Sequence, residues 1–422
     1  MDKILIVKDL IVDFHTYEGT VKVLDNVNFE LEKGETLGIV GETGCGKSVT
    51  VQTILRLIPT PPAMTKNGEI LFRVEEGAPE HAKTGGLQEN YVDLLELTES
   101  QMREIRGNRI SMVFQEPMTA LNPTITIGKQ IEKSFLLHRK SDLYNEALKR
   151  TDMEIKKLRS DLRQYEEGGK GTGKDLALKL RLMLRERYRT LYEDGLEGKE
   201  SRLQRFMSRV PILKGYKRSL EEDVKGRTVE MLRRVKIPTP EEIVDRYPHE
   251  LSGGMRQRVL IAMAVACNPD ILIADEPTTA LDVTTQAEIL RLIDELKSTI
   301  GCSVIYITHD LGVISEICDR VAVMYAGVIV ELGSVEIIFN RALHPYTRGL
   351  MRTRLKLGEK REYLDTISGT VPNLIHPPSG CRFHPRCPLA SDVCEKAKPI
   401  VAEVEDGHYV SCHLYSAPGD GD

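Results

Sequence analysis

The chain has 422 residues and a formal net charge of −5, from 58 Lys and Arg against 63 Asp and Glu. This length allows two or more domains, and the mildly acidic balance disfavours binding of nucleic acid over the whole surface. We expect no signal peptide and no membrane span, since no run of eighteen apolar residues occurs. Four of the eight cysteines are scattered, which favours a reducing compartment over a disulfide framework.

Residues 36–48 predict a buried strand, a glycine-rich turn and a helix. The strand is expected over 36–40, and GETGCGKS (41–48) fits the pattern G-x-x-x-x-G-K-[ST]. Backbone N–H groups of such a loop converge on phosphate oxygens, and the helix N-terminus adds a partial positive charge. Lys47 can reach the β- and γ-phosphates, and Ser48 can bind Mg²⁺. The expected nucleotide-binding residues of this loop are Gly41, Gly44, Cys45, Gly46, Lys47 and Ser48.

Two polar stretches follow the phosphate loop. EEGAPEHAKTGGLQEN (75–90) predicts a long loop in a hairpin, and residues 139–225 carry 23 basic and 16 acidic side chains, a net charge of +7. Apolar residues at helical spacing in 141–165 and 175–192, separated by GGKGTG, predict an antiparallel helical hairpin, with a third short helix near 200–207. The positions that predict its apolar face are Leu148, Ile155, Leu158, Leu162, Tyr165, Ala177, Leu180, Leu184, Tyr188 and Leu191.

The role of this basic insert has two interpretations. It is either a solvated elaboration of a helical subdomain or a surface for anionic lipid head groups or an acidic partner protein. Nucleic acid is disfavoured, because charges of both signs are interspersed and no aromatic stacking platform is evident.

A second apolar strand, DILIADEP (270–277), ends in two carboxylates. Asp275 at the end of the strand is placed to hold Mg²⁺ through water, and Glu276 is placed to polarise an attacking water. Together with the phosphate loop, this strand predicts a nucleoside triphosphatase built on a parallel α/β sheet.

Further motifs make the prediction specific. LSGGMRQR (251–258) resembles the signature motif of ABC-type ATPases, and VFQEP, TALD and YITHD occur in that family's order. The resemblance implies that Gln115 contacts Mg²⁺ and the attacking water, that His309 contacts the γ-phosphate, and that Asp282 lies at a dimer interface. Tyr17 is implied to stack on adenine. The signature residues Ser252, Gly253 and Gly254 are implied to complete the ATP site of an opposite subunit.

FQEPMTALNP (114–123), HPYTRGLM (344–351) and GCRFHPRCP (380–388) narrow the resemblance to the ATP-binding subunits of oligopeptide/dipeptide importers. The resemblance implies two transmembrane permease subunits, a homodimer or a heterodimer with a paralogous ATPase, and an extracellular substrate-binding protein as an indirect partner. It implies a peripheral location on the cytoplasmic face of the membrane. The expected substrate is a di- or oligopeptide, with an oligosaccharide or nickel as the alternative. A soluble ABC ATPase acting on DNA or ribosomes is a rival, disfavoured because the insert lacks a Cys-x-x-Cys hook and the chain holds a single ATPase unit.

The implied fold is an ABC-type nucleotide-binding domain of the α/β class, with a RecA-like parallel-sheet core, an antiparallel β subdomain and a helical subdomain. We expect this domain over residues 1–335, with the helical subdomain at about 116–255 and the basic insert at about 139–225. Residues 336–422 are expected to form a small cysteine-rich extension.

Cysteines in that extension have the spacing C-x5-C-x6-C-x17-C. Spacing alone leaves zinc, an iron–sulfur cluster and unligated thiols open. The family resemblance favours a [4Fe–4S] cluster beside the cofactors ATP and Mg²⁺. The expected cluster ligands are Cys381, Cys387, Cys394 and Cys412.

Overall fold

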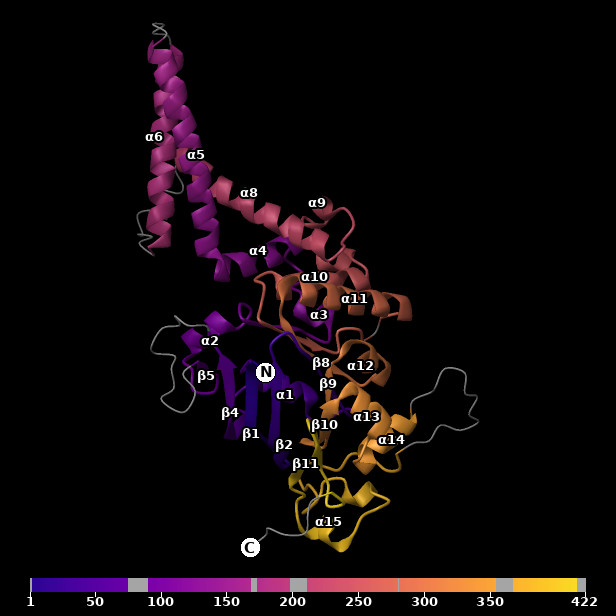
Figure 1. Ribbon diagram of the computed structural model, residues 1–422. Helices are drawn as coiled ribbons and strands as arrows, with labels where there is room; N and C mark the ends of the chain where they lie inside the picture. Colours follow the sequence, from indigo (N-terminus) through magenta and orange to yellow (C-terminus); the bar gives the residue numbers. More distant parts are fainter. Residues whose placement is uncertain are drawn as a thin grey trace. The chain divides into compact units, whose positions relative to one another are not determined.

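The structure, a computed structural model, divides the chain into two compact units (Figure 1). The first unit comprises Met1–Ala120 and Asn268–Asp422, and the second comprises Leu121–Cys267. The structure describes residues 2–74, 90–167, 173–197, 211–279, 281–353 and 367–415.

An eight-stranded sheet forms the centre of the first unit, in the order β11-β12-β10-β9-β3-β8-β7-β6. The five strands from β9 to β6 are parallel, and every residue of β3, β7 and β8 is buried, as expected for a parallel sheet covered on both faces. The predicted strands at 36–40 and 270–277 are present as β3 and β7. The bounds are β3 (Thr36–Val40), β6 (Ile110–Val113), β7 (Ile271–Asp275), β8 (Ser303–Thr308), β9 (Arg320–Tyr325), β10 (Val328–Ser334), β11 (Val401–Glu405) and β12 (His408–Ser411).

A second sheet of the same unit is antiparallel, in the order β2-β1-β4-β5. Leu5, Phe29 and Ile70 of this sheet belong to one buried apolar cluster with Ile39 and Ile305 of the large sheet. The two sheets therefore share one apolar core, and strand β3, which leads into the phosphate loop, is packed into that core. The bounds are β1 (Lys3–Thr16), β2 (Gly19–Glu32), β4 (Ala63–Arg73) and β5 (Tyr91–Asp93). The predicted polar loop lies almost wholly outside the described residues.

The helices of the first unit have identifiable end signals. The helix α11 follows Asp282, whose side chain accepts a hydrogen bond from the backbone N–H of Thr285, and it ends at Gly301, where φ is 76°. An aspartate N-cap and a left-handed glycine C-cap are favourable helix termini. The bounds are α1 (Lys47–Ile54), α2 (Glu99–Ile105), α3 (Pro117–Ala120), α11 (Val283–Ile300), α12 (Leu311–Ile317), α13 (Val335–Arg341), α14 (Pro345–Thr353), the 3-10 turn His384–Arg386 and α15 (Asp392–Lys396).

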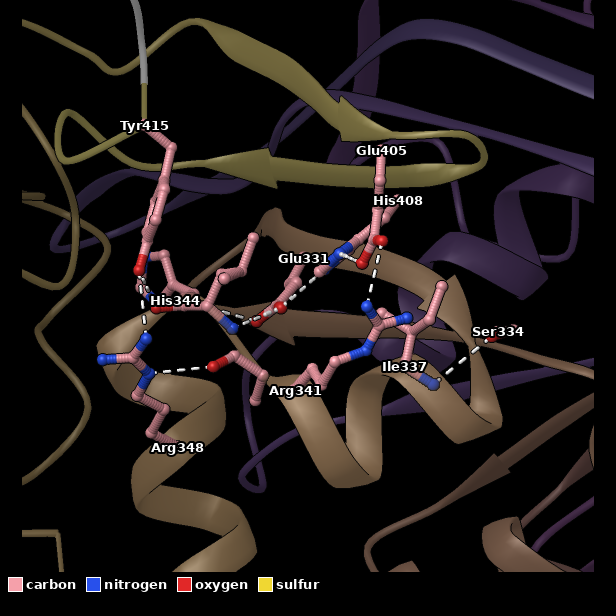
Figure 2. A network of polar contacts seen from close by, with 11 residues as sticks. Glu331, Ser334, Ile337, Arg341, His344, Arg348, Glu405, His408 and Tyr415 are labelled. Atoms are coloured by element: carbon pink, nitrogen blue, oxygen red, sulfur yellow. Dashed lines mark hydrogen bonds and ion pairs between the residues drawn. The ribbon is translucent and has the colours of Figure 1, made fainter.

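The C-terminal strands extend the large sheet of the first unit. Strand β12 pairs antiparallel with β10, and β11 pairs with β12. Figure 2 shows the polar network beneath this junction, where the fully buried Glu331 of β10 accepts hydrogen bonds from the backbone N–H groups of Leu343 (2.7 Å) and His344 (3.0 Å). Its carboxylate also contacts the buried ring of His408 at 2.9 Å, and the other ring nitrogen of His408 lies 3.3 Å from Glu405. The C-terminal hairpin is therefore joined to the core by buried polar contacts as well as by strand pairing.

The second unit is helical. Helices α5 and α6 run side by side as an antiparallel hairpin (Figure 1), with ion pairs between Glu154 and Arg185 (2.6 Å) and between Asp152 and Arg189 (3.1 Å). Many charges of the basic insert are thus satisfied within the hairpin itself. The bounds are α4 (Ile127–His138), α5 (Lys140–Glu167), α6 (Gly173–Leu196), α8 (Pro211–Arg234), α9 (Pro240–Ile243), the 3-10 turn Pro248–Glu250 and α10 (Gly253–Val265).

The apolar face predicted for this hairpin is buried at some of the predicted positions and exposed at others. Tyr188 and Leu191 are buried in a cluster with Tyr144. Ala177 and Leu180 were expected to face the partner helix, but both are exposed. Ile155 in the middle of α5 is also buried, so the prediction fails at the start of α6, around Ala177 and Leu180. The third predicted helix, near 200–207, lies outside the described residues.

Across the described ranges, no helix has both the length and the apolar character needed to cross a membrane.

Candidate functional site

Four neighbouring parallel strands bring the predicted residues of the first unit to one edge of the large sheet. The strands lie in the order β3-β8-β7-β6, so their carboxyl ends meet at that edge. The phosphate loop follows β3, His309 follows β8, Asp275 and Glu276 end or follow β7, and Gln115 follows β6. The topology thus assembles residues that are far apart in sequence.

Glycines allow the phosphate loop to adopt its backbone path. Gly41, Gly44 and Gly46 have φ angles of 156°, 81° and 105°, which other residues rarely adopt. A Cβ atom on Gly41 would lie 2.1 Å from the carbonyl oxygen of Met324, so any side chain there would collide with backbone. The loop therefore packs directly on the strand ends and leads into α1, which no side chain caps.

Lys47 lies along the inside of the loop. Its side chain is buried, and Nζ donates to the carbonyl oxygens of Gly41 (2.8 Å) and Glu42 (3.1 Å). The cation is thus held beside the uncapped N–H groups at the start of α1, an arrangement that suits phosphate oxygens.

Ser48 and Asp275 provide oxygen atoms that fit Mg²⁺. The Ser48 hydroxyl lies 3.0 Å from Oδ1 of Asp275. Burial raises the pKa of Asp275 and the charge of Glu276 adds to this, while the Ser48 hydrogen bond and Lys47 oppose it. A buried carboxylate whose charge is under-compensated, next to a hydroxyl, is a suitable donor set for a hard divalent cation.

Gln115, Glu276 and His309 form a hydrogen-bonded group. Gln115 Nε2 donates to Oε2 of Glu276 at 2.8 Å, and Nδ1 of His309 lies 3.3 Å from Oε1 of the same carboxylate. Thr279, which the sequence did not single out, donates to Oε2 at 3.0 Å. Glu276 has a φ of 45°, an unfavourable backbone conformation for a non-glycine residue and one that is concentrated at functional sites.

The remaining predicted residues take no part in the hydrogen bonds of the groups described above. Tyr17 is fully exposed in the turn between β1 and β2. Asp282 caps α11, and its hydrogen bonds to the backbone N–H and hydroxyl of Thr285 lower the pKa of its carboxyl. In the helical unit, Ser252 caps α10 by accepting from the backbone N–H of Met255, and Gly253 and Gly254 form the first helical positions.

The [4Fe–4S] prediction for the four C-terminal cysteines is wrong. All eight cysteines are free thiols, and among the residues that the structure describes no group of three or more His, Cys, Asp or Glu side chains is arranged to hold a metal ion. Burial raises the pKa of Cys381 to about 11 and also raises those of Cys387 and Cys412, with neighbouring thiols adding to the effect.

Three residues near the phosphate loop escaped the sequence analysis. Glu42, Tyr346 and Arg386 meet at the outer side of the loop, with distances of 3.0 Å from the Glu42 backbone N–H to the Tyr346 hydroxyl and 2.9 Å from Arg386 to the Glu42 carboxylate. The sequence offers one signal for this contact, the arginines within the cysteine-rich segment GCRFHPRCP (380–388). An arginine that is buried in such a segment needs an anionic partner. Sequence spacing could not identify that partner, because Glu42 precedes Arg386 by 344 positions.

Comparisons with known proteins agree with the motif order. The family model "ABC transporter" matches residues 24–279, and the model "Oligopeptide/dipeptide transporter, C-terminal region" matches residues 330–394. A probable peptide ABC transporter ATP-binding protein of Sinorhizobium fredii is 41% identical over 97% of this chain and 95% of its own length. The oligopeptide transport ATP-binding protein of Bacillus subtilis is 41% identical over 98% of this chain and 89% of its own length. The dipeptide transport ATP-binding protein of the same organism is 40% identical over 98% of this chain and 95% of its own length.

The first family model covers more than half of the chain, and the relatives align with nearly all of it. The phosphate loop, the Ser48–Asp275 pair, Gln115 and Glu276 lie within the matched segment, and His309 follows it in sequence on the same sheet edge. The chain therefore belongs to the ABC transporter family, in the oligopeptide/dipeptide transporter branch, and is an ATPase.

Proposed function

We propose that this chain is the ATP-hydrolysing subunit of an importer for di- or oligopeptides. The relatives that align with nearly its full length are named as peptide, oligopeptide and dipeptide transport ATP-binding proteins. The match of residues 330–394 to the C-terminal region of oligopeptide/dipeptide transporters supports the same substrate class.

The hydrogen-bonded group around Glu276 is the observation that best supports hydrolysis. In this proposal Glu276 accepts a proton from the attacking water, and Gln115 and His309 orient the carboxylate and the water. Lys47 and the loop N–H groups bind the β- and γ-phosphates of ATP. Ser48 and Asp275 would hold Mg²⁺, which supplies neutralisation of phosphate charge when bound. Tyr17 would stack on the adenine ring.

A dimer follows from the signature motif in this proposal. Ser252, Gly253 and Gly254 form the N-terminus of the 13-residue helix α10, where N–H groups and the helix dipole favour an anion. We propose that they bind the γ-phosphate of ATP on a second ATPase subunit, either an identical copy or a paralogue, with Asp282 at the interface. Two permease subunits would hold this dimer at the cytoplasmic face of the membrane, receiving substrate from an extracellular binding protein.

Replacement of the proposed base tests the assignment. We expect Glu276→Gln to retain ATP binding, because the phosphate loop is intact, and to lose hydrolysis by about 10² to 10⁴-fold. Steady-state phosphate release and equilibrium ATP binding measure the two quantities. Glu316→Gln, which changes an exposed glutamate on α12, is the matched control. Normal turnover by Glu276→Gln would contradict the role of Glu276.

The transport assignment needs the assembled complex. We expect the chain to co-purify with two membrane subunits and, in proteoliposomes with its binding protein, to hydrolyse ATP faster when a peptide is supplied. Stimulation by an oligosaccharide instead of a peptide would contradict the proposed substrate class.

A further inference from the structure

Two side chains of the C-terminal region contact Glu42 of the phosphate loop. The backbone N–H of Glu42 donates to the hydroxyl of Tyr346 at 3.0 Å, and the Glu42 carboxylate pairs with the guanidinium of Arg386 at 2.9 Å. The carbonyl oxygen of Glu42 also accepts the 3.1 Å hydrogen bond from Lys47. The position of Glu42 therefore sets the position of one hydrogen-bond acceptor of Lys47, the side chain proposed to bind the phosphates of ATP.

Arg386 is fixed in place and is not a mobile surface side chain. Only 6% of its side chain is exposed, and it donates to the carbonyl oxygens of Ser368 (2.9 Å) and Ile367 (3.2 Å) as well as to Glu42. Its guanidinium also contacts the Tyr325 hydroxyl at 3.3 Å and lies 5.6 Å from the centre of that ring. A buried arginine held by several partners can hold Glu42 in one position, unlike a solvated ion pair.

Aromatic packing gives Tyr346 a similarly fixed position. Tyr346, Tyr325 and Phe383 are all buried, with ring centres 4.6 Å apart for Tyr325–Tyr346 and 5.1 Å apart for Tyr325–Phe383. Phe383 lies three positions before Arg386, so one short segment of the cysteine-rich region supplies both an aromatic and a cationic contact. Tight packing of this kind restricts the hydroxyl that accepts the Glu42 N–H.

A second arginine of the same segment acts on the other end of the loop. Arg382, 4% exposed, donates to the carbonyl oxygen of Ala326 and pairs with Asp25 at 3.0 Å. The neighbouring backbone N–H of Gly327 donates to the carbonyl oxygen of Cys45 at 2.8 Å. The turn between β9 and β10 thus connects Arg382 to the phosphate loop.

We propose that Tyr346, Arg382 and Arg386, here called the C-terminal brace, are positioning residues for the phosphate loop. The brace holds Glu42 and Cys45 so that the loop is pre-organised for the phosphates of ATP. Pre-organisation raises affinity because less conformational freedom is lost on binding. This inference rests on the proposed function, in which residues 41–48 bind ATP. It assigns to the C-terminal region a part in nucleotide binding, in place of the metal-cluster role expected from its cysteines.

Three substitutions in the full-length protein test the brace. Tyr346→Phe removes only a hydroxyl, Arg386→Gln removes the charge, and Arg386→Lys keeps the charge while losing the forked geometry. We expect Tyr346→Phe and Arg386→Gln each to weaken equilibrium binding of Mg²⁺–ATP by about tenfold, the equivalent of one lost charge-assisted or buried hydrogen bond. Arg386→Lys should recover part of the loss.

A double-mutant cycle separates positioning from general destabilisation. Glu42→Gln and Arg386→Gln should together weaken ATP binding by much less than the product of their separate effects, because both remove the same contact. Arg341→Gln is the matched control, since it breaks an exposed ion pair with Glu405 in the same C-terminal region and should leave ATP affinity unchanged. Circular dichroism and thermal unfolding verify folding of each variant.

The outcomes are distinguishable. Wild-type affinity in folded Tyr346→Phe and Arg386→Gln would overturn the brace while leaving the proposed function in place. If Arg386→Gln fails to fold, wild-type affinity in Tyr346→Phe together with Glu42→Gln would overturn it. Equal ATP binding by wild type and Lys47→Ala would instead contradict the ATP site itself.

Discussion

His344 shows how burial of one side chain sets a pH dependence. It is almost fully buried, its Nδ1 accepts the backbone N–H of Tyr346 at 3.1 Å, and burial lowers its pKa to about 3. An unfolded histidine has its ordinary pKa near 6.5, so the unfolded state binds a proton that the folded state excludes. The stabilisation from the neutral, buried ring is complete above about pH 6.5. It is lost progressively as the pH falls towards 3, and the loss amounts to about 2 kcal/mol at pH 5.

The test compares urea unfolding at pH 7 and pH 5. We expect wild type to lose about 2 kcal/mol more than His344→Asn over this interval, because asparagine can accept the same hydrogen bond without titrating. His15→Asn, at an exposed position of β1, should behave as wild type. Equal pH dependence in wild type and His344→Asn would refute the assignment.

Two glycines of the phosphate loop differ in what surrounds them. A Cβ atom on Gly41 would meet the Met324 carbonyl oxygen at 2.1 Å, whereas one on Gly44 would have no neighbour within 4 Å. We expect Gly44→Ala to cost about 1 kcal/mol, from its left-handed backbone alone. Gly41→Ala should cost clearly more, since backbone must move. Chemical denaturation of both variants measures the difference, and equal losses would contradict the packing of the loop.

At the scale of elements, local patterns predicted β3, β7 and the helical hairpin, because each carries its signal within a short stretch of sequence. The contact face of α6 was not predictable in the same way. Leu180 has the expected spacing but is exposed, and its neighbour Lys179 forms an ion pair with Glu166 of α5 at 3.6 Å. Strand β12 was missed because its pairing partner in the large sheet, β10, ends more than 70 residues before β12 begins, and β11 joins the sheet only through β12.

Exchange of one interhelical ion pair tests the register of the hairpin. Arg185→Glu should place two acidic groups opposite each other and destabilise the α5–α6 contact by roughly 0.5–1 kcal/mol. Adding Glu154→Arg restores opposite charges and should recover most of the loss. Amide hydrogen exchange in α5 and α6 reports local opening. No recovery in the double variant would contradict the 2.6 Å pairing.

At the scale of the whole molecule, contacts between residues far apart in sequence shape the site, and sequence motifs do not predict such contacts. The nucleotide motifs are contiguous or follow strand ends, so Lys47, Asp275 and Glu276 could be located without a structure. The brace could not be predicted, because Arg386 acquires its partner only when the C-terminal region folds against the strands around the phosphate loop. The expectation of an iron–sulfur cluster failed for a related reason, since cysteine spacing says nothing about burial and side-chain geometry.

Attachment of the C-terminal hairpin depends on the buried contact between Glu331 and His408 (Figure 2). His408→Ala should leave the Glu331 carboxylate buried without its ring partner and destabilise the first unit by about 1–3 kcal/mol, the cost of a lost buried hydrogen bond. Arg341→Ala, which removes the exposed pair with Glu405, should cost less than about 1 kcal/mol. Thermal unfolding compares the two, and a small effect of His408→Ala would show that strand pairing alone attaches the hairpin.

The distance in sequence between Glu42 and Arg386 also bears on biosynthesis. A ribosome makes the phosphate loop early, yet the loop cannot receive its ion pair until the chain has been extended by 344 further residues. Domains generally fold during synthesis from the N-terminus, so this loop acquires its ion pair only after the residues around Arg386 have been made. A product that ends between His309 and Arg386 would contain the nucleotide motifs but would lack the contact of Arg386 with Glu42.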